Sequence, residues 1–389
     1  MAGAAVVTLD LGDLGLDEGA HLLIKRALAR DPTVTVRGSS ATLGIDLPAW
    51  ARAQGHSVSA HGGTFVLSRG PDRWSGAERA GAVGAPEARA PAHWGLAARG
   101  ALVERGAPEL DLPLSTRSEV WADEAARLYA QAAAAQWDPA TAIPWDAPID
   151  HPDEVEDAVV QVMTYLIENE TAALLVPARF LGRIHPHFRE VMQLLAIQAA
   201  DEARHIEIFT RRAHLRRDVL GLSTAGGQAS LASLFEEPDF AIASFLLSVL
   251  GEGSFLSLLW FLREHAPDQC TREVARFSAQ DEARHVAFGL AHLQRHVTED
   301  PQLRERLAAA IGRRHASLAH TAGLNAEVFD ALILLAAGSW DPAALRRGHA
   351  AVVDLQRAMD DGRKQRLSRL GFAPDQAAAL SALHTRNFM

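Results

Sequence analysis

The pentapeptide DEARH stands at residues 201–205 and recurs unchanged at residues 281–285. Within each copy the glutamate and the histidine are three residues apart, so on an α-helix both side chains project from one face. A single copy would carry little weight, because glutamate and histidine at this spacing are common on solvated helix faces. Two identical copies, each with an acidic residue upstream, favour a shared chemical role.

The upstream acidic residues lie inside apolar stretches. Glu170 stands in LIENETAALLVPARFL (166–181) and Glu252 in VLGEGSFLSLLWFL (249–262). An unpaired carboxylate would be costly in such surroundings, which argues against purely structural ion pairs on the helix surface. We choose Glu170 over the neighbouring Glu168, because the five residues from Glu170 align with the five that start at Glu252.

Turn signals divide each of the two helical stretches almost evenly. Pro186 lies 16 residues from the glutamates on either side of it, Glu170 and Glu202, and Pro267 lies 15 residues from Glu252 and Glu282. Because a helix rises by about 1.5 Å per residue, a chain that goes up one helix and down the next returns to the same level. The spacing therefore predicts two helical hairpins that bring their acidic residues to a common height.

These motifs resemble those of the ferritin-like di-iron and di-manganese carboxylate proteins, in which two helices each supply a glutamate and two others a Glu-x-x-His pair. The resemblance implies a ferritin-like all-α helical bundle with extra helices over residues 115–389. Residues 210–240 are then the long crossover between the hairpins. It also implies two iron ions per chain, with manganese as the alternative, held by Glu170, Glu202, His205, Glu252, Glu282 and His285.

Further residues of the motifs are expected around the ligands. Asp201 and Asp281 are candidates to hydrogen-bond the ligating imidazoles and fix their orientation. Arg204 and Arg284 are expected to pair with these aspartates, with solvated helix faces as the alternative. Among the other residues of the chain, His185 and His187 flank the first turn and are expected to be exposed.

Aromatic residues on the site-bearing helices and two outer segments complete the expected site. Phe255, Trp260 and Phe288 either line a substrate pocket or belong to the ordinary core. The segment that ends in QWDPATAIPWD (136–146) and the tail that ends in HTRNFM (384–389) suggest extra helices that enclose the site.

The resemblance implies a non-haem di-iron oxygenase or oxidase, such as a monooxygenase, that uses dioxygen to oxidise a small-molecule substrate. Electrons would come from that substrate or from an external donor. Two alternatives stay open, a di-manganese or di-iron catalase or peroxidase and a non-catalytic metal-binding scaffold or iron sensor. Phe209 occupies the position of the radical tyrosine of ribonucleotide reductase small subunits, and Ser278 that of an additional histidine ligand in p-aminobenzoate N-oxygenases. Both departures argue against those two families.

The composition narrows the class of protein. The net charge of −10 over 389 residues provides no basic excess to neutralise phosphates, so we expect no nucleic-acid partner. Cys270 is the only cysteine, which leaves oxygen and nitrogen as metal ligands. Residues 241–262 are long enough to span a membrane, but Glu252 at their centre favours a buried helix. With no secretory signal at the start, we expect a cytoplasmic protein without a membrane partner, and a homodimer.

The first 70 residues predict a small α/β domain, so the fold class is α+β with two domains. Its expected elements are strands at 5–9, 33–37, 57–60 and 64–67 and helices at 17–30 and 43–54. Residues 71–114, rich in Gly, Ala and Pro, predict a linker with little regular structure.

This N-terminal domain resembles the TusA-like sulfur carriers, which form a small α/β sandwich. The resemblance rests on LDLGDLGLDEGAHLLIKRAL (9–28), DLPAWARAQGH (46–56) and GTFVLSRG (63–70). That family carries sulfur on a cysteine, followed by proline, at the entrance to the first helix. Here Glu18 and Gly19 occupy those positions, so without a thiol no sulfur transfer is expected. Docking or substrate shielding is one expectation for the domain, and a retained structural appendage is the other.

Overall fold

The computed structural model describes residues 7–318 and 326–383 and divides the chain into two compact units. The first unit runs to Arg79 and includes Leu102–Ala107. The second comprises Ala80–Ala101 and the chain from Pro108 onward. The expected terminal segment 384–389 lies outside the described residues.

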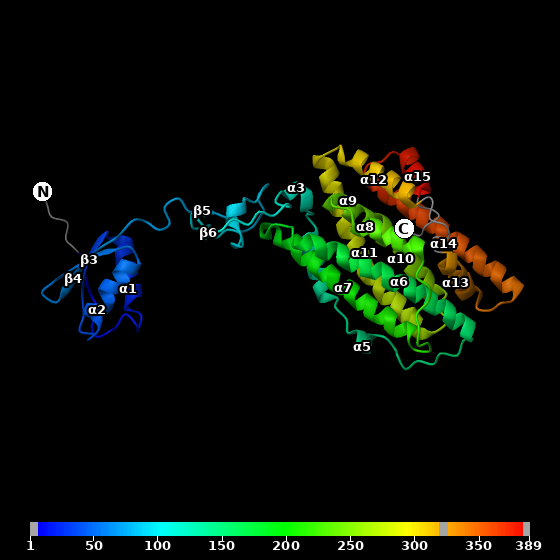
Figure 1. Ribbon diagram of the computed structural model, residues 1–389, viewed down its shortest axis with the longest axis horizontal. Helices are drawn as coiled ribbons and strands as arrows, with labels where there is room; N and C mark the ends of the chain where they lie inside the picture. The colour runs from blue at the N-terminus through cyan, green and yellow to red at the C-terminus, as the bar shows by residue number, and fades with distance from the viewer. Residues whose placement is uncertain (1–6, 319–325, 384–389) are drawn as a thin grey trace. The chain divides into compact units, whose positions relative to one another are not determined.

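The first unit is a four-stranded sheet with two helices (Figure 1). Its strands follow the order β1-β2-β4-β3, with β1 and β2 parallel and the other neighbours antiparallel. The succession of strands and helices confirms the predicted secondary structure, although the first two residues of the expected strand 5–9 lie outside the described part. The elements are β1 (Val7–Asp10), α1 (Ala20–Arg30), β2 (Thr33–Arg37), α2 (Leu43–Ala53), β3 (Ser57–His61) and β4 (Thr64–Ser68).

Alternation along β2 explains why both helices pack on the same face of this sheet. Val34 and Val36 are fully buried, and they share one apolar cluster with Ile24 of α1 and Leu47 of α2. Burying each of these aliphatic side chains contributes about 1.5–3 kcal/mol to folding. The cluster therefore gives the unit a core of its own.

The entrance to α1 has a backbone that no proline can adopt. Gly19, which precedes the helix, has φ = 105°, whereas the proline ring holds φ near about −65°. Glu18 accepts a hydrogen bond from the Gly15 amide at 2.9 Å and so closes the loop before the helix. Glu18 and Gly19 thus have a structural role in this loop.

The two compact units together include the whole of the expected linker 71–114, although little of it forms regular structure. It contains the short pairing of β5 (Glu78–Arg79) with β6 (Leu102–Val103) and a 3-10 turn, η1 (Ala92–Trp94). Residues 80–101 and those after 107 belong to the helical unit, because Trp94 and Arg99 are buried there. The burial of these two side chains attaches the segment to the helical unit, although its composition is rich in Gly and Pro.

The expected exposure of the first-turn histidines is also wrong. His185 and His187 are 1% and 2% exposed. The Nε2 of His187 accepts a hydrogen bond from the Glu87 amide at 2.8 Å, and its ring lies 5.0 Å from that of Trp94. Burial, with help from the nearby Arg99 charge, lowers the pKa of His187 to about 4. Residues 80–101 cover this turn, which local sequence around the histidines does not reveal.

Four long helical stretches run side by side in the second unit (Figure 1). α6 and α7 form the first hairpin through η2 (Pro186–Phe188), and α10 and α11 form the second, which confirms both predicted turns. The crossover between the hairpins contains a helix of its own, α8 (Ala225–Phe235). The bundle elements are α6 (Asp153–Leu181), α7 (Arg189–Ala213), α9 (Phe240–Ser244), η3 (Phe245–Glu252), α10 (Gly253–Glu264) and α11 (Gln269–Glu299).

The third stretch, Phe240–Glu264, is long and apolar enough to cross a membrane by length and composition. However, 83% of its most apolar window is buried inside the protein. Burial by neighbouring helices explains the apolar composition without a bilayer, and this supports the expected core helix.

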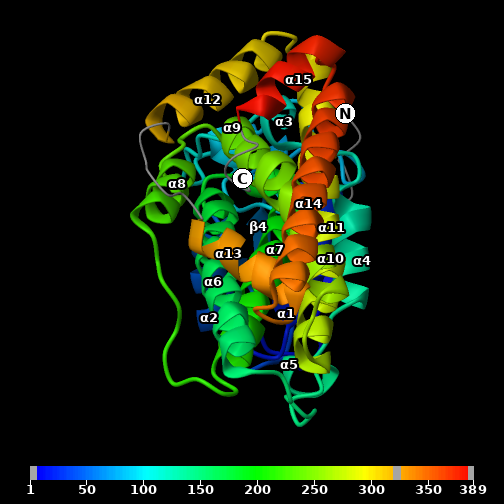
Figure 2. The same ribbon diagram turned by 90° about the vertical axis from the view of Figure 1, so that its right-hand side faces the viewer.

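Outer helices surround the bundle (Figure 2). α13 packs on α6 and α14, α14 packs on α10, and α4 packs between α7 and α11. The segment that ends at Asp146 contains α4 and α5, and the tail contains α14 and α15, so both segments supply extra helices as expected. The outer elements are α3 (Arg117–Val120), α4 (Ala125–Ala134), α5 (Pro139–Ala142), α12 (Leu303–Leu318), α13 (Ala326–Ala337), α14 (Pro342–Arg369) and α15 (Pro374–Ala382).

Candidate metal centre

Six carboxylate and imidazole side chains from the four bundle helices meet inside the second unit. Each of them is at most 4% exposed. Glu170 comes from α6, and Glu252 is the last residue of η3. The two Glu-x-x-His pairs come from α7 and α11, and the six residues are Glu170, Glu202, His205, Glu252, Glu282 and His285.

These side chains form two overlapping groups, in each of which the ligand atoms lie within 4.8 Å of one another. Both groups contain Glu202 and Glu282. One group adds Glu170 and His205, and the other adds Glu252 and His285. The arrangement can hold two adjacent metal ions, each with one terminal glutamate and one histidine, with two glutamates between them.

Both imidazoles turn Nδ1 toward the carboxylates. In the first group, Nδ1 of His205 lies 3.2 Å from Glu202 and 3.3 Å from Glu282. In the second group, Nδ1 of His285 lies 3.0 Å from Glu202 and 3.5 Å from Glu282. The Nε2 atoms point away from the cluster, toward other partners.

The side chains fit a pair of cations, since many of their buried polar atoms have no hydrogen-bond partner. Such atoms include Oε1 of Glu170, Oε2 of Glu252, both carboxylate oxygens of Glu282 and Nδ1 of His285. An unsatisfied buried carboxylate is costly, and a bound metal ion would remove that cost. The glutamates and imidazoles supply hard oxygen and nitrogen donors, which suit iron and manganese.

The pKa shifts of these side chains also favour a pair of bound cations. Burial, followed by repulsion from Glu202 and Glu282, holds the pKa of Glu170 well above its usual range, and burial and Glu282 do the same for Glu252. Burial lowers the pKa of His205, but the neighbouring carboxylates of Asp281 and the glutamates outweigh it and leave that pKa well above its ordinary value. The cluster thus retains protons to offset its negative charge, and metal cations would take over this role.

The aspartates of the two motifs contact the imidazoles crosswise. Oδ2 of Asp281 lies 3.3 Å from Nε2 of His205, and Oδ2 of Asp201 lies 3.3 Å from Nε2 of His285. An aspartate on Nε2–H leaves Nδ1 unprotonated and free to bind a metal. Each motif therefore orients the histidine of the other motif.

The arginines lie where the motifs predict, beside these aspartates. Arg204 bonds Asp201 of its own helix and lies 3.0 Å from Asp281 of the other helix. Arg284 bonds Asp281 and lies 3.7 Å from Asp201. The four side chains form one network with buried aspartates and partly buried arginines, so the alternative of solvated helix faces does not hold for the arginines.

Two further partners of the aspartates were missed in the sequence. Trp137 donates from Nε1 to Asp281 at 2.9 Å, and Gln136 donates to Asp201 at 3.0 Å. The guanidinium of Arg204 lies 4.6 Å from the Trp137 ring centroid. The segment 136–146 was expected to enclose the site, but its spacing gave no signal for these individual contacts.

The third bundle helix departs from regular α-geometry just before its glutamate. η3 is a π-helix that ends at Glu252, whose Oε1 accepts a hydrogen bond from Gln198 at 3.1 Å. Arg366 of α14 donates to the Val249 carbonyl at 2.6 Å. A Cβ on Gly253 would lie 2.4 Å from Nε of this arginine, so glycine permits the close approach. The π-segment thereby sets where Glu252 enters the cluster, a frequent use of such segments at functional sites.

A small cavity of about 20 Å³ adjoins the terminal glutamates and is otherwise mostly apolar. Phe255 lines it, in agreement with one of the two expectations, whereas Trp260 is 43% exposed and Phe288 lines a different cavity. A neighbouring cavity of about 10 Å³ is lined by Tyr165 and by Glu168, which does not join the cluster. The two cavities share Asn169 and Leu231 in their walls, and their remaining lining includes Leu234, Leu247, Thr224 and Leu222.

Comparison with known proteins bears on the fold. No protein-family model and no curated protein matches the chain. Among solved structures it is similar to a single-residue mutant of an R2-like ligand-binding oxidase with an aerobically reconstituted Mn/Fe cofactor, at 19% identity and a TM-score of 0.50, over 63% of this chain and 93% of that one. A second mutant of an R2-like ligand-binding oxidase, with an anaerobically reconstituted Mn/Fe cofactor, is also 19% identical, with a TM-score of 0.49 over 63% and 92% of the two chains. At this identity the similarity establishes the fold, and the helical unit has the ferritin-like bundle of the R2-like oxidases.

Proposed function

We propose that the helical unit is a non-haem dinuclear oxidase or oxygenase that uses dioxygen to oxidise a small organic molecule. The observation that carries this proposal is the pair of overlapping ligand groups with Glu202 and Glu282 in common. Four carboxylates would balance the charge of two divalent cations. Iron, alone or together with manganese, suits this set of donors, and the R2-like oxidase with its Mn/Fe cofactor supports that choice.

The side chains around the centre would hold the ligands in place. Asp201 and Asp281 keep the Nδ1 atoms of the imidazoles available, and Gln198 orients Glu252. Bound metal ions would supply the redox chemistry that these side chains lack. The apolar walls beside the terminal glutamates would keep water from the oxidising site.

The cavity beside Glu170, Glu252 and Phe255 is our candidate for the substrate site. Its volume of about 20 Å³ is close to that of one water molecule, so a substrate would require its walls to move apart. α8 supplies part of the wall through Leu231 and Leu234 and belongs to the crossover between the hairpins. We therefore expect a small, mostly apolar substrate. The external electron donor, the homodimer and the cytoplasmic location stay predictions.

Oxygen uptake by the metal-loaded protein tests the proposal. The protein is loaded with Fe(II), or with Mn(II) and Fe(II), under anaerobic conditions and then mixed with oxygen in an oxygen electrode. We expect repeated uptake only when a reductant or an oxidisable substrate is present, and no uptake by a Glu202→Ala variant. Rapid disproportionation of hydrogen peroxide with neither reductant nor substrate present would contradict the proposal and favour the catalase alternative. A single slow oxidation under all conditions would contradict the proposal and favour a non-catalytic metal-binding scaffold.

A further inference from the structure

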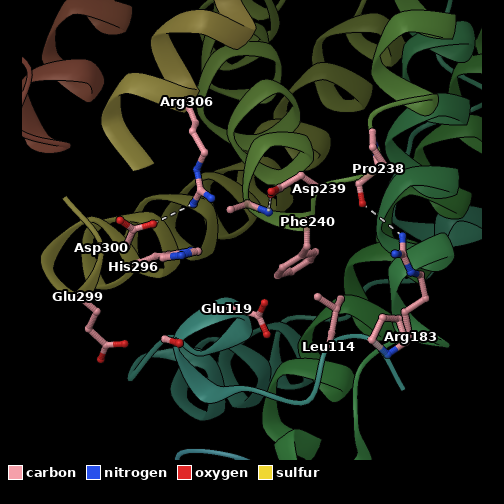
Figure 3. Close-up of a pocket in the computed structure, with 13 residues that line it drawn as sticks. Leu114, Glu119, Arg183, Pro238, Asp239, Phe240, His296, Glu299, Asp300 and Arg306 are labelled. Carbon is pink, nitrogen blue, oxygen red and sulfur yellow. Dashed lines mark hydrogen bonds and ion pairs between the residues drawn. The ribbon is translucent and has the colours of Figure 1, made fainter. Parts of the chain in front are cut away.

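A second, larger cavity lies in the helical unit, apart from the metal centre. Its volume is about 550 Å³, within the range of small-molecule sites, and none of the six candidate ligands lines it. It is bounded by α3, the turn after α6, the start of α9, the end of α11 and α12 (Figure 3). The cavity thus offers a binding site that the metal chemistry does not use.

One side of this cavity carries hydrogen-bond acceptors. His296 is 8% exposed, and its Nδ1 has no hydrogen-bond partner among the described residues. Burial, together with the Arg306 charge, lowers the pKa of this imidazole, so it is neutral at pH 7 and retains an acceptor nitrogen. Glu119 lies close enough to His296 to act on its charge, and no hydrogen bond or ion pair engages its carboxylate within the described part of the chain.

The other acidic groups of the lining are already engaged. Asp300 pairs with Arg306 at 3.0 Å. Asp239 accepts hydrogen bonds from the first amides of α9 at 2.9 and 3.1 Å. Glu299 pairs with Arg295 at 2.8 Å. Glu119 is therefore the carboxylate of this cavity that is available to a ligand.

The opposite side carries a cation. Arg183 donates one hydrogen bond, at 3.3 Å, to the Pro238 carbonyl, and none of the described carboxylates forms an ion pair with it. A guanidinium has five N–H donors, so most of them stay available to an anion. Figure 3 shows Arg183 across the cavity from His296, with Phe240 and Leu114 between them. Glu119 lies between His296 and Leu114 in this view, on the side of the apolar residues away from Arg183.

We propose that this cavity binds a linear zwitterion of the ω-amino acid class. The ammonium group donates to the Glu119 carboxylate and to the imidazole of His296. The carboxylate of the ligand accepts from Arg183, and its methylene chain packs on Phe240 and Leu114. The separation of the two charged ends favours a ligand whose charges are several bonds apart over one that carries both on a single carbon. The site stands independently of the proposed function, because none of the six candidate metal ligands lines it.

Calorimetric titration of the full-length, metal-free protein tests this site. The probes are the ω-amino acids from γ-aminobutyrate to ω-aminooctanoate, together with the alkylamine and the alkanoate that match the best binder in length. We expect one chain length to bind best, and both matched probes to bind at least about tenfold more weakly, because each lacks one charge-assisted contact. The proposal is overturned if no member binds at up to about 10 mM. Equal binding of the amine or the alkanoate would overturn it as well.

Substitutions test which residue binds the ammonium group of the ligand and which residue binds its carboxylate. Glu119→Gln and Arg183→Gln should each weaken binding of the best probe at least about tenfold, because each removes one charged partner. Arg183→Lys keeps the charge and should bind more tightly than Arg183→Gln. Glu299→Gln is the matched control, since its carboxylate lines the same cavity but is held by Arg295. If Glu299→Gln weakens binding as much as Glu119→Gln, the contact with Glu119 is refuted. Circular dichroism establishes that each variant is folded, and Glu119→Ala replaces Glu119→Gln if the latter is not.

Discussion

Oδ2 of Asp281 lies 3.3 Å from Nε2 of His205, so the aspartate of the second DEARH copy contacts the histidine of the first. Asp201 makes the reciprocal contact with His285, also at 3.3 Å. The two copies are therefore not two independent sites. Each one holds the imidazole of the other, which gives a physical reason why both copies carry an aspartate and a histidine at the same spacing.

This relationship leads to a prediction for Asp281→Asn. An amide cannot hold the Nε2 proton of His205 as a carboxylate does, so metal affinity should fall by about 10–100-fold while the ligands stay in place. Competition with a chelator followed by elemental analysis measures the affinity. Asp201→Asn should have a similar effect, and Asp354→Asn, which alters an exposed pair with Arg357, should have none. An unchanged affinity in both site variants would contradict the crosswise arrangement.

Because two glutamates belong to both ligand groups, the loss of metal should depend on which glutamate is replaced. Iron-loaded protein should contain about two irons per chain. Glu202→Ala should lose most of both, because Glu202 belongs to both ligand groups, whereas Glu170→Ala should lose mainly one. Glu207→Ala, on the exposed face of the same helix as Glu202, is the control. One tightly bound iron that survives Glu202→Ala would exclude a dinuclear centre.

A buried ion network predicts a stability effect away from the metal centre. Arg212 donates to Glu156 at 2.8 and 2.9 Å and to Asp268 at 2.7 Å, and it joins α6, α7 and the start of α11. Arg212→Met leaves two buried carboxylates without their cation, so it should cost about 3–5 kcal/mol of unfolding free energy. Arg357→Met, at an exposed pair, should cost at most about 1 kcal/mol. Urea unfolding of the two variants provides the comparison, and equal losses would show that the network contributes no more than a surface pair.

The same network predicts a pH dependence. Burial raises the pKa of Glu156 and Asp268, but the contacts with Arg212 outweigh it and leave both values below their ordinary ones. Both groups thus bind protons less readily in the folded protein than in the unfolded chain. Their contribution to stability is complete above the ordinary carboxylate range and is lost as the pH falls through the lowered values. The difference in unfolding free energy between wild type and Arg212→Met should be largest near pH 7 and shrink as the pH falls, because in the variant burial favours protonation of both carboxylates and in the wild type the contribution is lost below about pH 4. If the difference in unfolding free energy grows on acidification, Arg212 does not lower the pKa values of Glu156 and Asp268.

The N-terminal unit should carry no sulfur. Residues 1–70 contain no cysteine, and burial raises the pKa of the single thiol, Cys270, to about 12. After incubation with a persulfide donor, the intact mass of the folded protein should not change. An aromatic disulfide reagent should likewise react only after unfolding, because Cys270 is fully buried. A sulfur adduct that maps to residues 1–70 would show that the resemblance has been misread.

The sequence by itself predicted the two helical hairpins and the residues that meet between them. Helical spacing places Glu202 beside His205 on one helix face, and the even position of Pro186 brings Glu170 to the same level. These relations depend on the rise and period of a helix, which act over a few turns of chain. The alternation in strand β2 is local in the same way, and the small N-terminal sheet was predictable for that reason.

Only the tertiary structure decided the contacts between distant segments. Asp281 on His205, Trp137 on Asp281, and Arg366 on the π-segment before Glu252 each join residues far apart in the chain. The same holds for residues 80–101, which pack over the turn that contains His187. Such pairings depend on how whole helices pack and on which buried polar groups find partners, and neither is encoded in the spacing of residues along one element.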